Sequence, residues 1–305
     1  MSTLLSGLDY IDLDFLGQPQ IIATAVIRGP GGVALVDPGP STTVGNLRAA
    51  LKTRGIAIGD VRQILLTHIH LDHAGGTGTL VKENPAIDVF VHERGAPHMI
   101  DPSKLLASAA RLYGADMERL WGDFLPVPAD RVRVLQGGER ITAAGRDLDV
   151  AYTPGHAWHH VSYFDRSSRV AFVGDTAGIR RGSGAYVMPP TPPPDIDLEA
   201  WRASGERILA WNPETLFLTH FGPFAGARQH VEALMDLLDA WSAIVRRLLA
   251  DNSLDDPRRE QAFVAEAVLD LERVLGAEEA EMYGRAGRID YSWQGLSRYW
   301  RKKIA

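Results

Sequence analysis

At residues 67–76 the chain reads Thr67-His68-Ile69-His70-Leu71-Asp72-His73-Ala74-Gly75-Gly76. The apolar run just before it, residues 61–67, is typical of a strand, so the histidines lie where a strand ends and a loop begins. Imidazole and carboxylate groups are costly to desolvate together unless a cation compensates them. The stretch therefore predicts ligands for two adjacent metal ions. His68 and His70 can face one ion, while Asp72 and His73 are offset towards the other.

Three more short segments end predicted strands and carry candidate ligands. They are Thr153-Pro154-Gly155-His156, Gly174-Asp175-Thr176 and Leu218-Thr219-His220-Phe221-Gly222. Strand ends are where α/β proteins assemble sites from distant parts of the sequence. A single His or Asp at a turn usually serves a backbone group, but the recurrence of this context in one chain indicates a common site. The predicted metal ligands are thus His68, His70, Asp72, His73, His156, Asp175 and His220.

The composition excludes several classes of protein. The 305 residues are 45% hydrophobic and 23% charged, which is ordinary for a globular enzyme. Cysteine is absent, so any metal must be held by nitrogen and oxygen. The formal net charge of −6, without a long basic run, argues against a nucleic-acid substrate. We expect a small-molecule substrate and leave the oligomeric state open, a homodimer included.

The amino-terminal segment carries no expected targeting signal. Residues 1–20 include Asp9, Asp12 and Asp14 and lack the basic start and apolar centre of a secretory signal. No stretch approaches the apolar length of a membrane span. The sequence therefore predicts a cytoplasmic protein that does not bind a membrane.

Strands and helices alternate over the first two thirds of the chain, and helices alone follow. Apolar runs and turn residues predict two hairpins, one that joins residues 21–27 to 33–37 and one that joins 161–164 to 170–173. They also predict a helix at 44–54, capped by Ser41 and Thr42, and a helical stretch at 94–121. From about residue 226 only amphipathic helices are expected. We predict a catalytic domain at 1–225 and a C-terminal helical region at 226–305 that packs on it.

A proline-rich segment follows Asp175 in the sequence. Residues 186–197 contain five prolines, which cannot lie in a helix interior or a central strand. The segment must be a stiff extended loop. It is either a wall or lid of the site or a plain surface connection.

The order HxHxDH, then a distal His, an Asp and a last His, resembles the metallo-β-lactamase superfamily over roughly residues 21–222. The resemblance implies an αββα sandwich with a C-terminal helical appendage, and a dinuclear site. It implies that the first ion is bound by His68, His70 and His156. By the same resemblance the second is bound by Asp72, His73 and His220, and Asp175 bridges both.

Within this superfamily the ligand set is similar to glyoxalase II and to the ester and lactone hydrolases. Residues 176–184 do not reproduce the cofactor-binding stretch of glyoxalase II, so glutathione recognition is not expected. The tyrosine that lactonases place after the bridging Asp is also missing, since Ala177 and Gly178 stand there. Tyr186 could substitute for it from the proline loop.

The predicted function is hydrolysis of a small ester, thioester, lactone or phosphoester. Two ions roughly 3.5–4 Å apart can share a water and lower its pKa to about 7, so that a bridging hydroxide is the nucleophile. Asp72 or a metal-bound water would protonate the leaving group. Zinc is the expected metal, with iron or manganese as alternatives. Other readings are a mononuclear iron enzyme resembling the persulfide dioxygenases, a β-lactamase and a non-catalytic scaffold.

Residues near the ligands have further predicted roles. Asp37 is a turn residue that can brace the ligand loop. His159 and His160 could orient ligands or simply fill half-buried positions. Trp158 and Phe221 are predicted to form walls of the pocket. Arg180 and Arg181 are predicted to be either a pair that attracts an anionic group or a pair of exposed charges.

Overall fold

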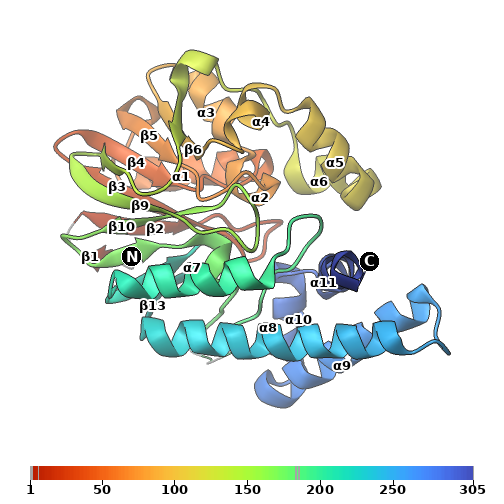
Figure 1. Ribbon diagram of the computed structural model, residues 1–305. Helices are drawn as coiled ribbons and strands as arrows, with labels where there is room; N and C mark the ends of the chain where they lie inside the picture. The colour runs from red at the N-terminus through yellow and green to blue at the C-terminus, as the bar shows by residue number, and fades with distance from the viewer. Residues whose placement is uncertain (1–2, 6, 183, 185, 305) are drawn as a thin grey trace.

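Two β-sheets packed face to face form the centre of the molecule (Figure 1). The computed structural model describes residues 3–5, 7–182, 184 and 186–304. The first sheet has the spatial order β1 (Thr3–Leu5), β2 (Leu8–Asp12), β3 (Ala23–Gly29), β4 (Gly32–Val36), β5 (Val61–Leu65), β6 (Asp88–His92) and β7 (Val132–Leu135). The second has the order β13 (Gly222–Ala225), β12 (Thr215–Leu218), β11 (Val170–Phe172), β10 (Val161–Asp165), β9 (Arg146–Tyr152) and β8 (Arg140–Ala143).

Helices cover the outer face of each sheet. On the first sheet lie α1 (Val44–Thr53), α3 (Thr77–Glu83) and α4 (Ala96–Ile100), followed by α5 (Ser103–Tyr113) and α6 (Met117–Trp121). On the second lie α7 (Leu198–Ala210) and α8 (Ala227–Ala250). The short α2 (Leu71–Ala74) holds part of the ligand loop. The chain ends in α9 (Asp256–Leu275), α10 (Ala277–Ala286) and α11 (Ile289–Ile304).

Alternating side chains divide the interior into layers. In β4, Val33 and Leu35 pack under the helices of the first sheet, whereas Ala34 lies in the core between the sheets. In β12, Leu216 faces the helices of the second sheet and Phe217 faces the core between the sheets. Successive strand residues point to opposite faces of a sheet, so a strand that is apolar on both faces is covered by helices on one side and by the other sheet on the other. The predicted αββα sandwich is confirmed.

The ligand segments follow strands that end at one edge of the sandwich. β4, β5 and β6 are parallel, as are β11 and β12, so their carboxyl ends lie on the same side of each sheet. The segment 67–76 follows β5, Asp175 follows β11 and His220 follows β12. This topology brings together residues that lie far apart in the sequence.

The carboxyl-terminal quarter of the chain is helical, as predicted. The amphipathic face of α8 is buried at Val231, Leu234, Leu238 and Trp241, and the later helices add Phe263, Tyr283, Trp293 and Leu296 to the same core. The start of α11 reaches α5, where the ring centroids of Tyr291 and Tyr113 are 5.6 Å apart. None of the helices in the described part of the chain combines the length and apolar character needed to cross a membrane.

One local prediction was wrong and one was too coarse, and two strands had no prediction. Strands β1 and β2 lie in residues 3–12, for which no element was predicted; Asp9 of β2 pairs with Arg54 at 2.7 Å. Ser41 begins a 3-10 turn before α1, and no side-chain cap is formed. The helical stretch 94–121 is broken at residues 101–102 and 114–116, where Pro102 and Gly114 interrupt it.

Candidate metal centre

The structure brings all the predicted ligands together. Their donor atoms form three overlapping groups, each within 4.8 Å: His68, His70 and His156; His68, His73 and Asp175; Asp72, His73 and His220. His68 and His73 are completely buried, and Asp72 keeps 25% of its side chain exposed. Among the described residues, therefore, the donor atoms converge from four separate loops.

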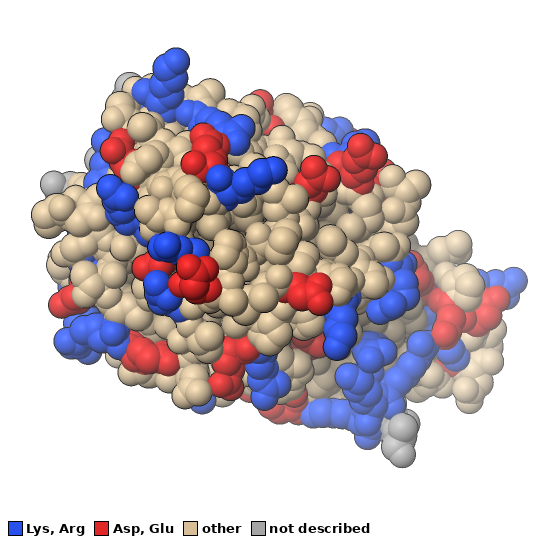
Figure 2. Space-filling view, turned by 90° about the horizontal axis from the view of Figure 1, so that it is seen from above, with Lys and Arg blue, Asp and Glu red and all other residues tan. Residues whose placement is uncertain are grey.

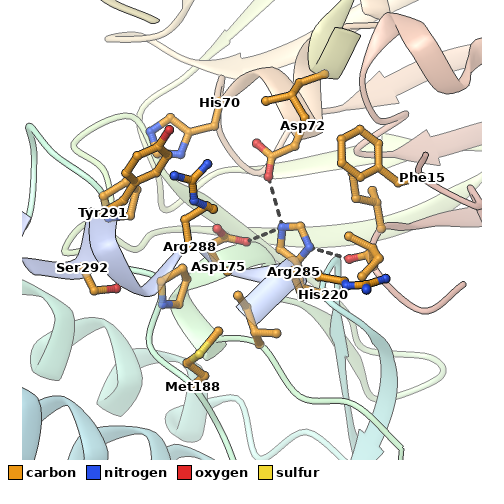
Figure 3. A pocket seen from close by; sticks show the side chains of 18 of the residues that line it. Phe15, His70, Asp72, Asp175, Met188, His220, Arg285, Arg288, Tyr291 and Ser292 are labelled. Atoms are coloured by element: carbon orange, nitrogen blue, oxygen red, sulfur yellow. Dashed lines mark hydrogen bonds and ion pairs between the residues drawn. The ribbon is translucent and has the colours of Figure 1, made fainter. Parts of the chain in front are cut away.

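Asp175 lies between the two ends of the cluster. Its Oδ1 is 3.2 Å from His73 Nε2, and its Oδ2 is 3.3 Å from His156 Nε2. His220 Nε2 lies 3.3 Å from Asp72 Oδ2 and 3.6 Å from Asp175 Oδ1. Figure 3 shows the His220 ring facing both carboxylates. One carboxylate oxygen of Asp175 is thus directed to each end.

Three of the histidines are oriented by acceptors on their outer sides. Nδ1 of His73 donates to Asp37 Oδ2 at 2.8 Å, and Nδ1 of His156 donates to Pro190 O at 2.8 Å. Nδ1 of His220 donates to Ile21 O at 2.6 Å. A carbonyl or carboxylate oxygen only accepts, so Nδ1 carries the proton. In the neutral ring Nε2 then turns its lone pair inward, as in histidines that bind metals.

Two buried atoms of the cluster have no hydrogen-bond partner among the described residues. They are His68 Nε2 and Asp175 Oδ1. Buried polar atoms are nearly always paired, because an unpaired one costs the full desolvation penalty. Both atoms point into the cluster of donors, where a cation would satisfy them. The nitrogen and oxygen donors fit zinc, iron or manganese.

The electrostatics of the cluster call for positive charge. Burial lowers the pKa of His73, but the carboxylates of Asp175, Asp72 and Asp37 outweigh burial and raise it well above its usual value. Burial raises the pKa of Asp72, whereas His73 and His220 lower it to about 2. The carboxylates are therefore ionised, and a proton or a metal cation must compensate them.

At the other end of the cluster the histidines are neutral. Burial places the pKa of His68 well below its ordinary value and lowers that of His70, and it brings the pKa of His156 to about 4. Neutral imidazole is the form that binds metals.

Asp37 joins two of the ligand loops. Its side chain is fully buried and accepts hydrogen bonds from Thr67 N at 2.8 Å, Thr67 Oγ1 at 2.7 Å, Thr219 Oγ1 at 2.7 Å and His73 Nδ1 at 2.8 Å. Thr67 precedes the ligand His68 and Thr219 precedes the ligand His220. The predicted brace is confirmed, and it holds both loops rather than one.

His159 and His160 also hold the ligand loops. His160 is buried, with Nδ1 2.9 Å from Thr153 Oγ1, and its ring stacks on His68 with centroids 5.1 Å apart. His159 Nδ1 accepts from the backbone N–H of Ile69 at 3.4 Å. Both therefore support the site, the orienting role that was one of the two predicted alternatives.

Gly155 sets the position of His156. Its φ is +135°, and a Cβ built on it would lie 2.3 Å from Cα of Trp201 in α7. Asp197 N donates to Gly155 O at 2.9 Å, which fixes the loop against that helix. Only glycine permits so close an approach with this backbone conformation.

We expect Gly155→Ala to lower the free energy of unfolding by about 2–3 kcal/mol, because the added methyl group must displace α7. It should also weaken metal binding by shifting His156. Urea denaturation measures the first effect. Gly45→Ala is the control, since a Cβ there meets nothing within 4 Å and alanine is favoured by about 0.5–1 kcal/mol in a helix. Equal stability of the two variants would contradict the packing argument.

A cavity of about 420 Å³ opens beside the ligands. His70, Asp72, His156, Asp175 and His220 lie at its base. Its walls are mainly apolar and include Phe15, Ile21, Ile22, Trp121, Ile179 and Met188. Residues 189–192 also line it, so the proline segment forms a wall of the site, one of the predicted alternatives. Pro190 additionally orients His156.

The carboxyl-terminal helices contribute to this cavity, which sequence reasoning missed. Arg285 of α10, Arg288 of the link that follows, and Tyr291 and Ser292 of α11 line it. Figure 3 shows Arg288, Tyr291 and Ser292 together on the side of the cavity away from Phe15, whereas Arg285 lies near His220 on the side of Phe15. No local pattern marks these residues, because they reach the site only through the packing of α11 against α5.

The predicted pocket walls at Trp158 and Phe221 were wrong. Neither lines the cavity. Arg94 lies over the Trp158 ring, 5.6 Å from its centroid, and Phe221 packs against Tyr10 in the core between the sheets. Nearness in sequence to a ligand does not direct a side chain into the cavity, because Trp158 and Phe221 lie in turns, where successive side chains point in different directions.

Arg180, Arg181 and Tyr186 also have other roles. Arg181 is buried, donates to the carbonyl oxygen of Gln20 and pairs with Glu279 at 3.3 Å, so it ties the amino-terminal loop to α10. Arg180 packs over Phe224, 4.3 Å from its centroid. Tyr186 directs its hydroxyl to Asp270 of α9 at 3.3 Å and does not line the cavity. The arginines therefore form neither an anion-attracting pair nor an exposed charge pair, and both predictions were wrong. The prediction that Tyr186 could take the place of the lactonase tyrosine was also wrong.

Known proteins are similar to this chain in sequence. The Metallo-beta-lactamase fold-containing protein ST1585 from Sulfurisphaera tokodaii is 28% identical over 211 residues, 67% of this chain and 74% of that protein. A hydroxyacylglutathione hydrolase from Aeromonas hydrophila is 30% identical over 151 residues, 50% of this chain and 44% of the enzyme. The chain thus spans less than half of that enzyme's length.

A solved structure extends the likeness to the carboxyl-terminal helices. The metallo-β-lactamase family protein TTHA1429 from Thermus thermophilus superimposes with a TM-score of 0.72 over 99% of this chain and 96% of its own, at 24% identity. Residues 17–220 match the sequence profile of the metallo-β-lactamase superfamily. Because this match covers more than half of the sequence and includes every predicted ligand, the chain belongs to the metallo-β-lactamase superfamily.

Proposed function

We propose that this protein is a dinuclear metal hydrolase that cleaves a small thioester or ester, with lactones and phosphoesters as related substrates. The observation that carries the proposal is the pair of buried, unpartnered atoms, His68 Nε2 and Asp175 Oδ1, at the centre of the converging ligands. The cavity beside them offers room for a substrate of small size.

Two complete sets of donors support two ions. His68, His70 and His156 would hold one ion and Asp72, His73 and His220 the other, in the groups that the geometry defines. Asp175 would be shared, since its two oxygens are directed to the two ends. A mononuclear oxygenase would leave the second set without a role, which favours the hydrolase.

Two divalent ions, when bound here, supply an activated water at neutral pH and polarise the bond to be cleaved. The protein's own groups then position the reactants. Asp72 is the carboxylate most accessible from the cavity, and its low pKa makes it a hydrogen-bond acceptor for the attacking water. It can pass the proton it accepts to the leaving atom.

The apolar wall indicates the kind of acyl group. Phe15, Ile21, Ile22 and Met188 lie beside the ligands and would enclose an aliphatic or aromatic acyl portion. The Aeromonas relative is named for hydrolysis of a thioester, hydroxyacylglutathione. We therefore place thioesters first among the candidate substrates.

The test combines metal analysis with turnover assays. We expect purified protein to hold about two ions per chain and to hydrolyse thioesters, esters or lactones. A chelator should abolish turnover and lower the melting temperature, because ions that bind only the folded state stabilise it. Added zinc, iron or manganese should restore both. About one iron per chain, with oxygen consumption and no hydrolysis, would overturn the proposal.

A further inference from the structure

A second cavity, of about 460 Å³, lies next to the cavity of the metal centre. The two cavities share His70, Tyr113 and Pro192 in their linings. The second cavity continues between α5, the proline segment and α11. A substrate whose scissile bond lies at the metal ligands could therefore extend into both cavities.

Basic side chains surround this second cavity. Lys104 and Arg111 come from α5 and Arg298 comes from α11. All three are exposed, and the described residues provide no ion pair or hydrogen bond for any of their side chains. Figure 2 shows Lys and Arg side chains spread over this face of the molecule, at its left as well as at its lower right, with Asp and Glu side chains among them.

The arginines of the first cavity are different, because each has a carboxylate partner. Arg119 pairs with Asp116 at 3.0 Å, Arg285 with Glu281 at 2.7 Å and Arg288 with Asp290 at 2.6 Å. Their charge is compensated within the protein. The guanidinium and ammonium groups of the second cavity keep all their donors available for a ligand.

The charge of the second cavity matches a dianion. Among the described residues that line it, Asp195 is the only carboxylate, so Lys104, Arg111, Arg298 and Asp195 together give a formal charge of +2. A phosphate monoester carries a charge close to −2 at neutral pH and offers three acceptor oxygens.

We propose that this second cavity is a subsite for the phosphorylated leaving group of the substrate. The inference rests on the proposed function and adds the substrate class: a thioester or ester of a phosphorylated thiol or alcohol. Its acyl portion lies in the apolar first cavity, and its phosphate lies among Lys104, Arg111 and Arg298. The three side chains come from two helices, so they can approach a phosphate from two sides.

The border between the cavities is suited to a chain that crosses it. Tyr113 closes the end of α5, and no described residue bonds to its hydroxyl. Burial raises the pKa of Tyr113, so the phenol stays protonated and can donate to the connecting part of the substrate. Pro192 has no N–H and presents only its ring and carbonyl.

The experiment compares thioesters that share one acyl group and differ in the leaving thiol. Butyryl-coenzyme A carries phosphates, butyryl-glutathione carries carboxylates, and butyryl-N-acetylcysteamine is neutral. We expect KM for the coenzyme A thioester to be at least about tenfold lower than for the neutral one, and to rise with ionic strength because exposed charges are screened. Glutathione should give a smaller gain.

Variants assign the effect to the proposed residues. Arg111→Gln combined with Arg298→Gln should raise KM for butyryl-coenzyme A about tenfold and change kcat by less than about twofold. The neutral thioester should respond by less than about twofold in kcat/KM. Arg301→Gln is the matched control, because Arg301 lies one turn further along α11, pairs with Asp256 at 2.7 Å and does not line the cavity.

The outcomes separate this inference from the proposed function. Equal KM values for the charged and neutral thioesters, or the lowest KM with glutathione, would overturn the phosphate subsite and leave the hydrolase intact. Turnover of none of the thioesters, esters or lactones would overturn the hydrolase. In that case calorimetric titration with adenosine 3′,5′-bisphosphate decides: binding that the double variant weakens supports the subsite, and unchanged or absent binding overturns it.

Discussion

Replacing Asp175 by asparagine lowers kcat/KM by at least about 10³-fold and reduces the bound metal from about two ions to about one. Asparagine keeps the shape of the side chain, so the fold should survive. It offers one neutral oxygen in place of two charged ones, and Asp175 directs one oxygen to each end of the ligand cluster. The variant therefore loses the carboxylate that both ions would share, while the histidines of both ligand sets stay in place.

Elemental analysis and thioester hydrolysis measure this prediction together. Asp123→Asn is the control, because Asp123 is exposed, lines neither cavity and belongs to none of the ligand groups. The control should keep both ions and full kcat. Wild-type metal content in Asp175→Asn, together with undiminished turnover, would show that Asp175 is not a ligand.

Replacing Asp37 by alanine lowers the free energy of unfolding by about 3–5 kcal/mol. The change removes the acceptor of four buried hydrogen bonds, which come from Thr67, Thr219 and His73. These donors cannot reach water, because Asp37 and all three partners are at most 1% exposed. The φ of +51° at Asp37 adds strain for alanine, whereas aspartate and asparagine tolerate it.

Urea denaturation of the metal-free protein checks this value. Asp123→Ala, which removes an exposed carboxylate, should change stability by less than about 0.5 kcal/mol. If Asp37→Ala does not fold, Asp37→Asn provides the second measurement. Asparagine retains one acceptor oxygen, so it should fold with intermediate stability and bind metal more weakly than the wild type. Wild-type stability and metal affinity in Asp37→Asn would refute the bracing role.

The sequence alone determined the order of strands and helices and the candidate ligands, because both depend on local patterns, whereas the sandwich was implied by the resemblance of the ligand motif to a known family. Strand alternation is set by residues two positions apart, as Val33, Ala34 and Leu35 illustrate. Metal ligands must be His, Asp or Glu in a chain without cysteine, and they follow strands that end at one edge. The motif at 67–76 and the later histidines satisfy both conditions.

The tertiary structure alone decided which surfaces enclose the site. Trp158 and Phe221 adjoin ligands in sequence yet point elsewhere, whereas Tyr291 lies far along the chain and lines the cavity. The availability of Arg111 and Arg298 for a ligand likewise depends on which carboxylates come near them. The physical reason is that packing of α11 against α5 involves contacts between segments far apart in the sequence. Such contacts leave no periodic or local mark in the sequence, and they set the shape and charge that a substrate meets.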